Sequence, residues 1–173
     1  MEIRELQAED RDAVERFVER VPEGDRTFFK EDVEAPGVLD AWTRPGTARA
    51  VAVEDGEVIG YVAVVPLHGW SSHVGEVRVI VDPGRRGRGI GRALARRAVL
   101  EAVELELRKM VVEVVADHEP TIAMFRSLGF DPEALLTNQV RDQSGALRDL
   151  MILAHSVEEQ WSSLAVAGIA DEL

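Results

Sequence analysis

The sequence predicts an α/β fold in one domain, with a mixed central sheet flanked by helices. A length of 173 residues fits one domain. Apolar residues recur with strand spacing in some segments and with helical spacing in others. Asp55-Gly56 joins two β-rich runs, which is typical of an antiparallel hairpin. The strict strand–helix alternation of a doubly wound nucleotide fold is absent from the pattern.

The first quarter of the chain predicts one strand and one helix before an irregular segment. Residues 2–6 alternate and predict a strand. Helical spacing predicts an amphipathic helix over about 9–20, which Pro22 ends. Residues 22–46 predict a loop with one or two short helices, which either shapes a pocket or only covers the core.

The remaining elements follow from β-rich runs bounded by turn residues and from two helical patterns. Pro120 stands at the start of the second helical pattern, where helices accept proline. We expect strands over 48–54, 57–65, 74–81, 109–115, 135–140 and 147–154, a helix from Gly89, and a short helix over 120–128. These elements define a predicted domain over 1–156.

A helical extension is predicted over 157–173. It carries Trp161, Leu164 and Ile169 on one face. This face packs on its own domain or forms a subunit contact, as in a homodimer.

Composition excludes several classes of protein. The chain has no cysteine, so disulfides, thiolate zinc sites and a cysteine nucleophile are excluded, and we expect no metal site. The acidic start MEIRELQAED is no signal peptide. No apolar run approaches the roughly 18 residues of a membrane span. We therefore expect a cytoplasmic protein that binds no membrane.

The positive charge of the chain is concentrated in one segment. The net charge is −12, which argues against a nucleic acid partner. Six arginines and no acid lie between Arg85 and Arg97, and without them 14 bases face 32 acids, a net charge of −18. The window predicts a specific anion site. The acidic remainder either attracts a cationic amine or only keeps the protein in solution.

The arginine window joins a strand to a helix through a glycine-rich turn. Glycines let the backbone approach a ligand, and a helix start offers unpaired N–H donors, so the segment suits a phosphate. A P-loop would need lysine and a hydroxyl residue after Gly89, where Ile90 and Gly91 stand. A dinucleotide fingerprint would need glycine at position 92, which is Arg92.

Two motifs carry a resemblance to a known family. Arg86-Gly-Arg-Gly-Ile-Gly91 fits the pattern Arg/Gln-x-x-Gly-x-Gly/Ala, and Leu128-Gly-Phe130 follows a short helix at the expected distance. The chain, over roughly 1–155, resembles the GNAT superfamily of acetyl-CoA-dependent N-acetyltransferases. The resemblance implies a GNAT-like fold with about seven strands, antiparallel in its N-terminal part and splayed at the CoA site.

The resemblance also implies which residues bind acetyl-CoA as co-substrate. The pyrophosphate would meet backbone N–H groups of the loop and helix start, namely Arg86, Gly87, Arg88, Gly89, Ile90, Gly91 and Arg92. The pantetheine arm would bond to the strand backbone at Val79, Ile80 and Val81. The N–H near Val79 would face the thioester carbonyl and stabilise an oxyanion.

Direct attack by an amine needs a base, because an aliphatic amine arrives mostly protonated. Glu76, ten residues before the signature, is the candidate, or it is an ordinary charged residue at a strand start. His73 and His68 are weaker candidates. The chain departs from the family at two cofactor-contact positions. Phe125 stands where many members have a tyrosine that protonates the departing thiolate, and His118 stands where many have asparagine.

The acceptor is an amine that the sequence does not identify. Candidate contacts are Phe28, Phe29, Trp42, Trp70 and Asp149. Asp149 either binds the amine or fixes the last hairpin. Two other functions stay open: a non-catalytic acyl-CoA sensor or interaction module, and a transferase for a longer acyl group.

Overall fold

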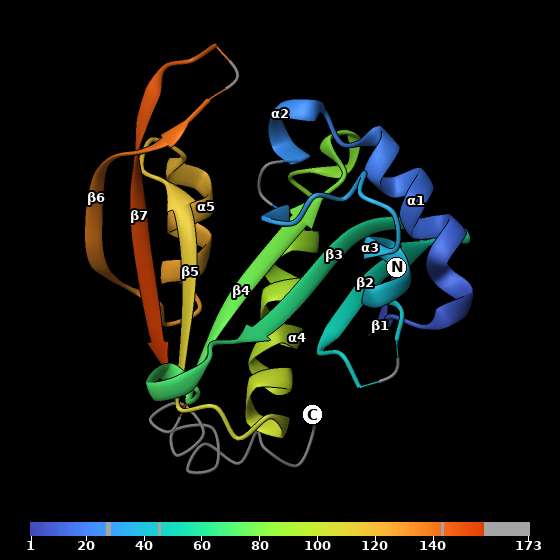
Figure 1. The fold of residues 1–173 in the computed structure, drawn as a ribbon, viewed down its shortest axis with the longest axis horizontal. Coiled ribbons are helices and arrows are strands. Elements are labelled where there is room, and N and C mark those ends of the chain that lie inside the picture. The colour runs from blue at the N-terminus through green and yellow to red at the C-terminus, as the bar shows by residue number, and fades with distance from the viewer. Residues whose placement is uncertain (27–28, 45, 143, 158–173) are drawn as a thin grey trace. The chain divides into compact units, whose positions relative to one another are not determined.

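The computed structural model describes residues 1–26, 29–44, 46–142 and 144–157. Over these residues seven strands and five α-helices follow the predicted order (Figure 1). The strands are β1 (Glu2–Glu5), β2 (Arg49–Glu54), β3 (Glu57–Pro66), β4 (Val74–Val81), β5 (Lys109–Val115), β6 (Asp131–Arg141) and β7 (Leu147–Ser156). The helices are α1 (Arg11–Arg20), α2 (Glu23–Arg26), α3 (Val38–Trp42), α4 (Ile90–Glu104) and α5 (Glu119–Arg126).

The strands form a mixed sheet in the order β1-β2-β3-β4-β5-β7-β6. The predicted α/β fold class is therefore confirmed. Backbone contacts divide the chain into two compact units. Unit 1 comprises Met1–Val65 and Val77–Ala98, and unit 2 comprises Pro66–Glu76 and the chain from Val99 on. Strand β4 begins in unit 2 and continues in unit 1.

Unit 1 is built on an antiparallel meander. Strand β1 pairs with β2 from Glu2↔Val53 to Glu5↔Ala50, and β2 pairs with β3 across the Asp55-Gly56 turn. Apolar side chains of α1 and α3 pack on one face of these strands. Four aromatic residues of this core, Phe17, Phe29, Trp42 and Tyr61, form a contiguous cluster with ring centroids 4.6–6.3 Å apart.

Helix α4 packs against β3 at a glycine. A Cβ added to Gly60 would lie 2.8 Å from Leu94 Cδ1, 3.1 Å from Ile90 Cγ2 and 3.4 Å from the Ile80 carbonyl oxygen. Real Cβ atoms are almost never closer than 3.0 Å to such an atom. The absence of a side chain at Gly60 therefore lets the first turns of α4 approach the sheet.

Unit 2 is built on the antiparallel pairs β5–β7 and β6–β7. Helix α5 packs through Phe125, whose ring lies 5.1 Å from Phe130, and Phe130 stacks on His155 of β7 at 4.9 Å. The His155 Nδ1 lies 2.8 Å from the carbonyl oxygen of Gly129. The Leu128-Gly129-Phe130 motif thus ties the end of α5 to the sheet.

Element boundaries agree with the predicted ones to within two residues except at β6. The predicted strands 74–81 and 109–115 are found with those bounds, and residues 22–46 hold the short helices α2 and α3 as expected. Strand β6 runs over Asp131–Arg141, longer than the predicted 135–140. The predicted C-terminal helix lies, from residue 158 on, outside the described residues. Among the described helices, none is long and apolar enough to cross a membrane.

Candidate active site

The arginine- and glycine-rich loop after β4 is a turn followed directly by a helix start. The Asp82 carboxylate accepts the Gly84 N–H at 2.9 Å and caps a single 3-10 turn over Pro83–Arg85. At the start of α4 the Ala93 N–H donates a hydrogen bond to the Gly89 carbonyl at 3.0 Å. The amides of residues 90–92 precede that bond and have no intrahelical acceptor.

Two glycines give the loop its shape. Gly87 and Gly89 have φ angles of +77° and +79°, a region that residues with a side chain rarely adopt. A Cβ built on either glycine meets no atom within 4 Å. The backbone is therefore open to a ligand at both positions. Open backbone next to a helix start fits a pyrophosphate group, which binds to backbone N–H groups and to the positive end of a helix.

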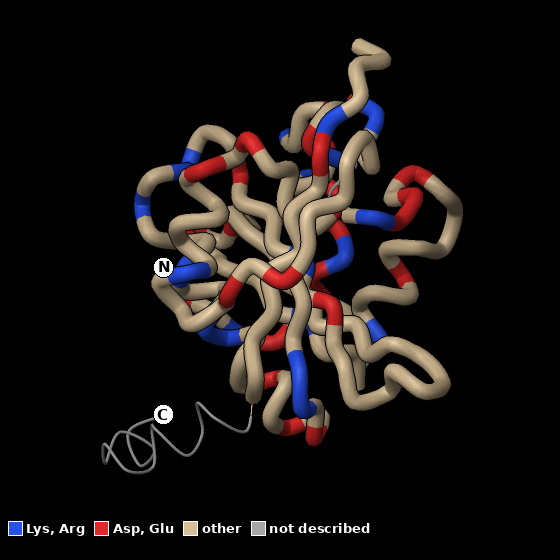
Figure 2. Tube along the Cα trace, turned by 90° about the vertical axis from the view of Figure 1, so that its left-hand side faces the viewer, with Lys and Arg blue, Asp and Glu red and all other residues tan. Residues whose placement is uncertain are grey.

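Three of the loop arginines bond to carboxylates of unit 1. Arg85 donates to Glu54 at 2.6 Å, and Arg88 donates to both oxygens of Glu54 at 2.7 and 3.0 Å. Arg86 donates to Asp25 of α2. The hydrogen bonds from Arg88 lower the pKa of the Glu54 carboxyl. Figure 2 shows that basic and acidic segments are interspersed along the trace.

The start of the loop is held by an ion pair that the sequence did not indicate. Arg20, at the end of α1, donates through Nε to Asp82 at 2.9 Å and through Nη2 to the Val58 carbonyl at 2.6 Å. Asp82 is 9% exposed, and its N–H donates to the Ile59 carbonyl at 3.0 Å. Arg20 therefore connects α1, β3 and the residue that caps the loop turn.

The predicted base and the pantetheine strand lie on β4. Glu76 is partly buried and belongs to unit 2, whereas Val79, Ile80 and Val81 belong to unit 1. Ile80 is a core residue at 5% exposure, and Val79 and Val81 are partly buried. The role of Glu76 as a base, that of the Val79 N–H and the splay of the strands stay predictions.

The two departures from the family pattern lie on α5. His118 is exposed and forms the N-cap, and its carbonyl accepts the N–H groups of Thr121 and Ile122. Phe125 is 2% exposed and packs on Phe130. Phe125 is thus a core residue of unit 2, and its predicted contact with CoA stays a prediction.

The aromatic acceptor candidates differ sharply in exposure. Phe29 and Trp42 are each 1% exposed in the core of unit 1, whereas Trp70 is 97% exposed. Phe28 lies outside the described residues. Tyr61 is also buried, and burial raises the pKa of its hydroxyl, which accepts a hydrogen bond from Arg49 Nε at 2.8 Å. Tyr61 is thus a core residue of unit 1.

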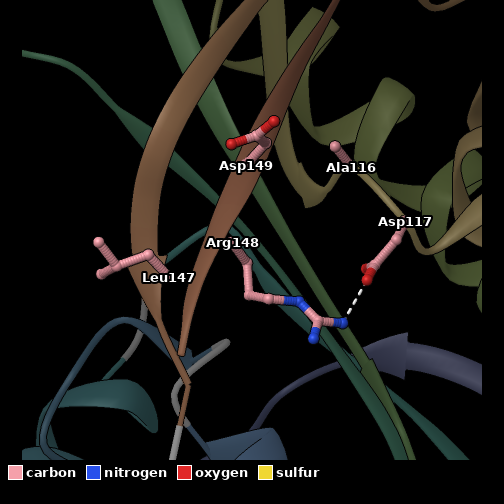
Figure 3. Close-up of a pocket in the computed structure, with 5 residues that line it drawn as sticks. All are labelled: Ala116, Asp117, Leu147, Arg148 and Asp149. Carbon is pink, nitrogen blue, oxygen red and sulfur yellow. Dashed lines mark hydrogen bonds and ion pairs between the residues drawn. The ribbon is translucent and has the colours of Figure 1, made fainter. Parts of the chain in front are cut away.

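Asp149 lines a pocket of about 390 Å³ in unit 2, together with Ala116, Asp117, Leu147 and Arg148 (Figure 3). Arg148 donates to Asp117, and the Asp149 carboxylate points away from that pair. One Asp149 oxygen accepts the Asn138 N–H at 2.8 Å, where Asn138 has a φ of +54°. Asp149 therefore fixes an irregularity of β6 and also contributes an acid to the pocket.

Sequence reasoning missed Arg20, Asp25, Glu54 and Asp117. The first three come from elements far along the chain, 31 to 62 positions from their loop partners. Only Glu54 had a local signal, because it immediately precedes the Asp55-Gly56 turn and so ends a strand.

The fold and the loop are typical of acyltransferases of the GNAT type. The family model described as the acetyltransferase (GNAT) family matches residues 6–130, and the chain belongs to that family. The homologues carry names of N-acetyltransferases and N-acyltransferases, so the chain is an acyltransferase of this class.

Individual relatives are moderately similar. The chain is 27% identical over 135 residues to an uncharacterized N-acetyltransferase, YjgM, of Escherichia coli, covering 75% of this chain and 81% of the relative. It is 28% identical over 124 residues to the L-amino acid N-acyltransferase MnaT of the same organism, covering 70% and 72%. It also matches mycothiol acetyltransferases, but spans only 18% of the one from Nocardia farcinica.

A solved structure supports the fold. The acetyltransferase yncA of Salmonella typhimurium, solved with acetyl-CoA, superposes with a TM-score of 0.73 at 22% identity, covering 90% of this chain and 93% of that one.

Proposed function

We propose that the protein transfers an acetyl group from acetyl-CoA to a primary amine. The observation that carries the proposal is the open loop of Gly87 and Gly89 at the start of α4, in a chain of the GNAT family. Its backbone amides would hold the pyrophosphate of acetyl-CoA. Acetyl-CoA supplies the activated acyl group, and the protein positions it and accepts a proton from the amine.

Glu76 is the residue proposed to accept that proton. It lies on β4 three residues before Val79, whose backbone N–H is the proposed oxyanion donor. A positioned base contributes typically about 10²–10⁴-fold to such a reaction. Because the second position that often carries an acid is the buried Phe125, the departing thiolate leaves without help from that side chain. A CoA-like thiol has a pKa near 8.5 and is a fair leaving group.

The acceptor is proposed to be a small amine that meets an acidic surface. Asp149 and Asp117 place two carboxylates in the pocket of unit 2, beside Arg148. A pocket with both signs of charge suits an amine that also carries a carboxylate. The relative MnaT is named for L-amino acids, which makes these the first acceptors to test.

A panel of amines with acetyl-CoA tests the proposal. Thiol release that depends on the amine, together with a product heavier by one acetyl group, supports it. Binding of CoA without amine-dependent release would favour a sensor, and faster release from longer acyl-CoAs would favour another acyl donor. Failure to bind CoA at all would refute the proposal.

Replacement of Glu76 tests the base. We expect Glu76→Gln to lower turnover by at least about 100-fold and to change its pH profile, while CoA affinity stays at the parental value. Glu104→Gln, at the exposed end of α4, is the charge-matched control and should leave both unchanged. An unchanged pH profile in Glu76→Gln would remove Glu76 from the mechanism.

A further inference from the structure

Glu54 accepts hydrogen bonds from both sides of the Gly87 position. Arg85 belongs to the turn before this glycine, and Arg88 lies between the two open glycines. Arg85 Nη1 is 2.6 Å from Glu54 Oε2, and Arg88 reaches Oε2 at 3.0 Å and Oε1 at 2.7 Å. A single carboxylate at the end of β2 therefore connects two points of the loop to the β2–β3 hairpin.

The geometry of these bonds favours a strong contact. Arg88 uses two guanidinium nitrogens on two carboxylate oxygens, which is the bidentate arrangement that gives direction as well as attraction. The Glu54 side chain is 17% exposed, so water competes less for it than for a surface carboxylate. The three bonds on this one carboxylate restrain both Arg85 and Arg88.

The loop needs such a restraint. Glycine has more backbone freedom than any other residue, and fixing it costs the most conformational entropy. A pyrophosphate that binds to several N–H groups at once needs Gly87, Gly89 and the first turn of α4 in one arrangement. A loop that is already held in that arrangement binds with a smaller entropic cost.

Glu54 has an opposite effect through its charge. A carboxylate beside the arginines reduces the positive potential that attracts phosphate. If charge were its main effect, removal of Glu54 would strengthen CoA binding. If restraint were its main effect, removal would weaken binding although the loop becomes more positive. The two effects therefore predict opposite changes in CoA affinity when Glu54 is removed.

We propose that Glu54 is a positioning residue that holds the CoA loop in its binding conformation through Arg85 and Arg88. Its restraint outweighs its charge, because the arginines are 36% and 49% exposed and their long-range attraction is screened by salt. The inference rests on the proposed function, since it concerns the same loop.

Glu54→Gln and Glu57→Gln form a matched pair. Both remove one negative charge from the same hairpin, but Glu57 is 56% exposed and lies 3.9 Å from Arg85. By calorimetry with CoA we expect Glu54→Gln to bind roughly fivefold more weakly and Glu57→Gln to bind like the parent. Equal or tighter binding by Glu54→Gln would overturn the proposal.

A second readout needs no ligand. Trypsin cleaves after Arg85, Arg86 and Arg88, so its rate reports how often the CoA-free loop opens. We expect cleavage roughly fivefold faster in Glu54→Gln and unchanged in Glu57→Gln. Cleavage of Glu54→Gln at the parental rate would overturn the proposal. If the parent itself binds no CoA, the proposed function fails, whereas the trypsin comparison still decides whether Glu54 restrains the loop.

The same series of variants needs a control for correct folding. Circular dichroism compares the thermal transitions of all variants. If Glu54→Gln does not fold, Arg88→Gln breaks the bidentate pair from the other side and keeps two of the three cleavage sites. We expect faster cleavage after Arg85 and Arg86 in that variant as well, and parental rates there would overturn the restraint.

Discussion

Replacement of Gly60 by valine tests whether the close approach of α4 to β3 sets both stability and CoA binding. Gly60 lies under the first turns of α4, beside Leu94 and Ile90. Leu94 is fully buried, so its terminal methyl has little room to move away. A side chain at position 60 should therefore push α4, and with it the proposed phosphate-binding amides, away from the sheet.

The magnitude follows from the contacts. The backbone of Gly60 lies outside the left-handed region, so alanine itself is not strained there. Alanine gains about 0.4–1 kcal/mol by restricting the unfolded chain, which offsets much of the cost of the 2.8 Å contact with Leu94 Cδ1. Valine adds two methyl groups beside Ile90 and the Ile80 carbonyl. Overpacking of this kind costs about 1–3 kcal/mol.

Urea denaturation and calorimetry with CoA measure the two effects. We expect Gly60→Ala to stay within about 1 kcal/mol of the parent, and Gly60→Val to lose about 1–3 kcal/mol and to bind CoA about tenfold more weakly. Gly37→Val is the control: Gly37 has a φ of +83° and no neighbour within 4 Å of its Cβ, so strain lowers stability without moving α4. Parental stability and CoA affinity in Gly60→Val would refute the packing argument.

Three further predictions concern the loop. Gly89→Val should strain a backbone with a φ of +79° and abolish CoA binding with the fold kept, and parental affinity by calorimetry would contradict the loop assignment. Arg20→Ala should destabilise by about 1–2 kcal/mol and raise the KM for acetyl-CoA with little change in kcat, with partial recovery in Arg20→Lys; an unchanged KM would leave it a purely structural residue. The pKa of Glu54 is lowered from its ordinary value of 4.5, so its carboxylate should stabilise the loop at any pH above 4.5. This effect should be lost only as the pH falls through the lower pKa of Glu54 in the folded protein. A titration midpoint of the Glu54 carboxyl at or above 4.5, measured by NMR, would contradict this.

Local patterns were sufficient for the inner strands β4 and β5 and insufficient for the edge strand β6. Strands β4 and β5 are apolar runs between turn residues, and both were predicted to the residue. Strand β6 begins at Asp131-Pro132, two residues that by themselves predict a turn. Proline is accepted in an edge strand, where an N–H need not pair. The pairing of Pro132 with Leu153 of β7, which only the folded chain shows, extends the strand.

The partners of the arginine window could not be predicted for a different reason. Strand and helix patterns repeat within a few residues, whereas Arg86 meets Asp25 across 61 positions and Arg88 meets Glu54 across 34. No spacing rule connects such residues before the chain is folded. The sequence therefore indicated a concentration of positive charge but not its local neutralisation.

This pairing changes what the charge of the loop implies. Six arginines without nearby acids would bind an anion mainly by attraction, with a steep dependence on salt. With Arg85 and Arg88 on Glu54 and Arg86 on Asp25, much of that charge is balanced before a ligand arrives. The proposed recognition of pyrophosphate would then depend on the backbone of Gly87 and Gly89 and on the start of α4, whose N–H groups act over short distances. The shape of the loop, rather than the number of its arginines, is the property that would determine how a phosphate ligand binds.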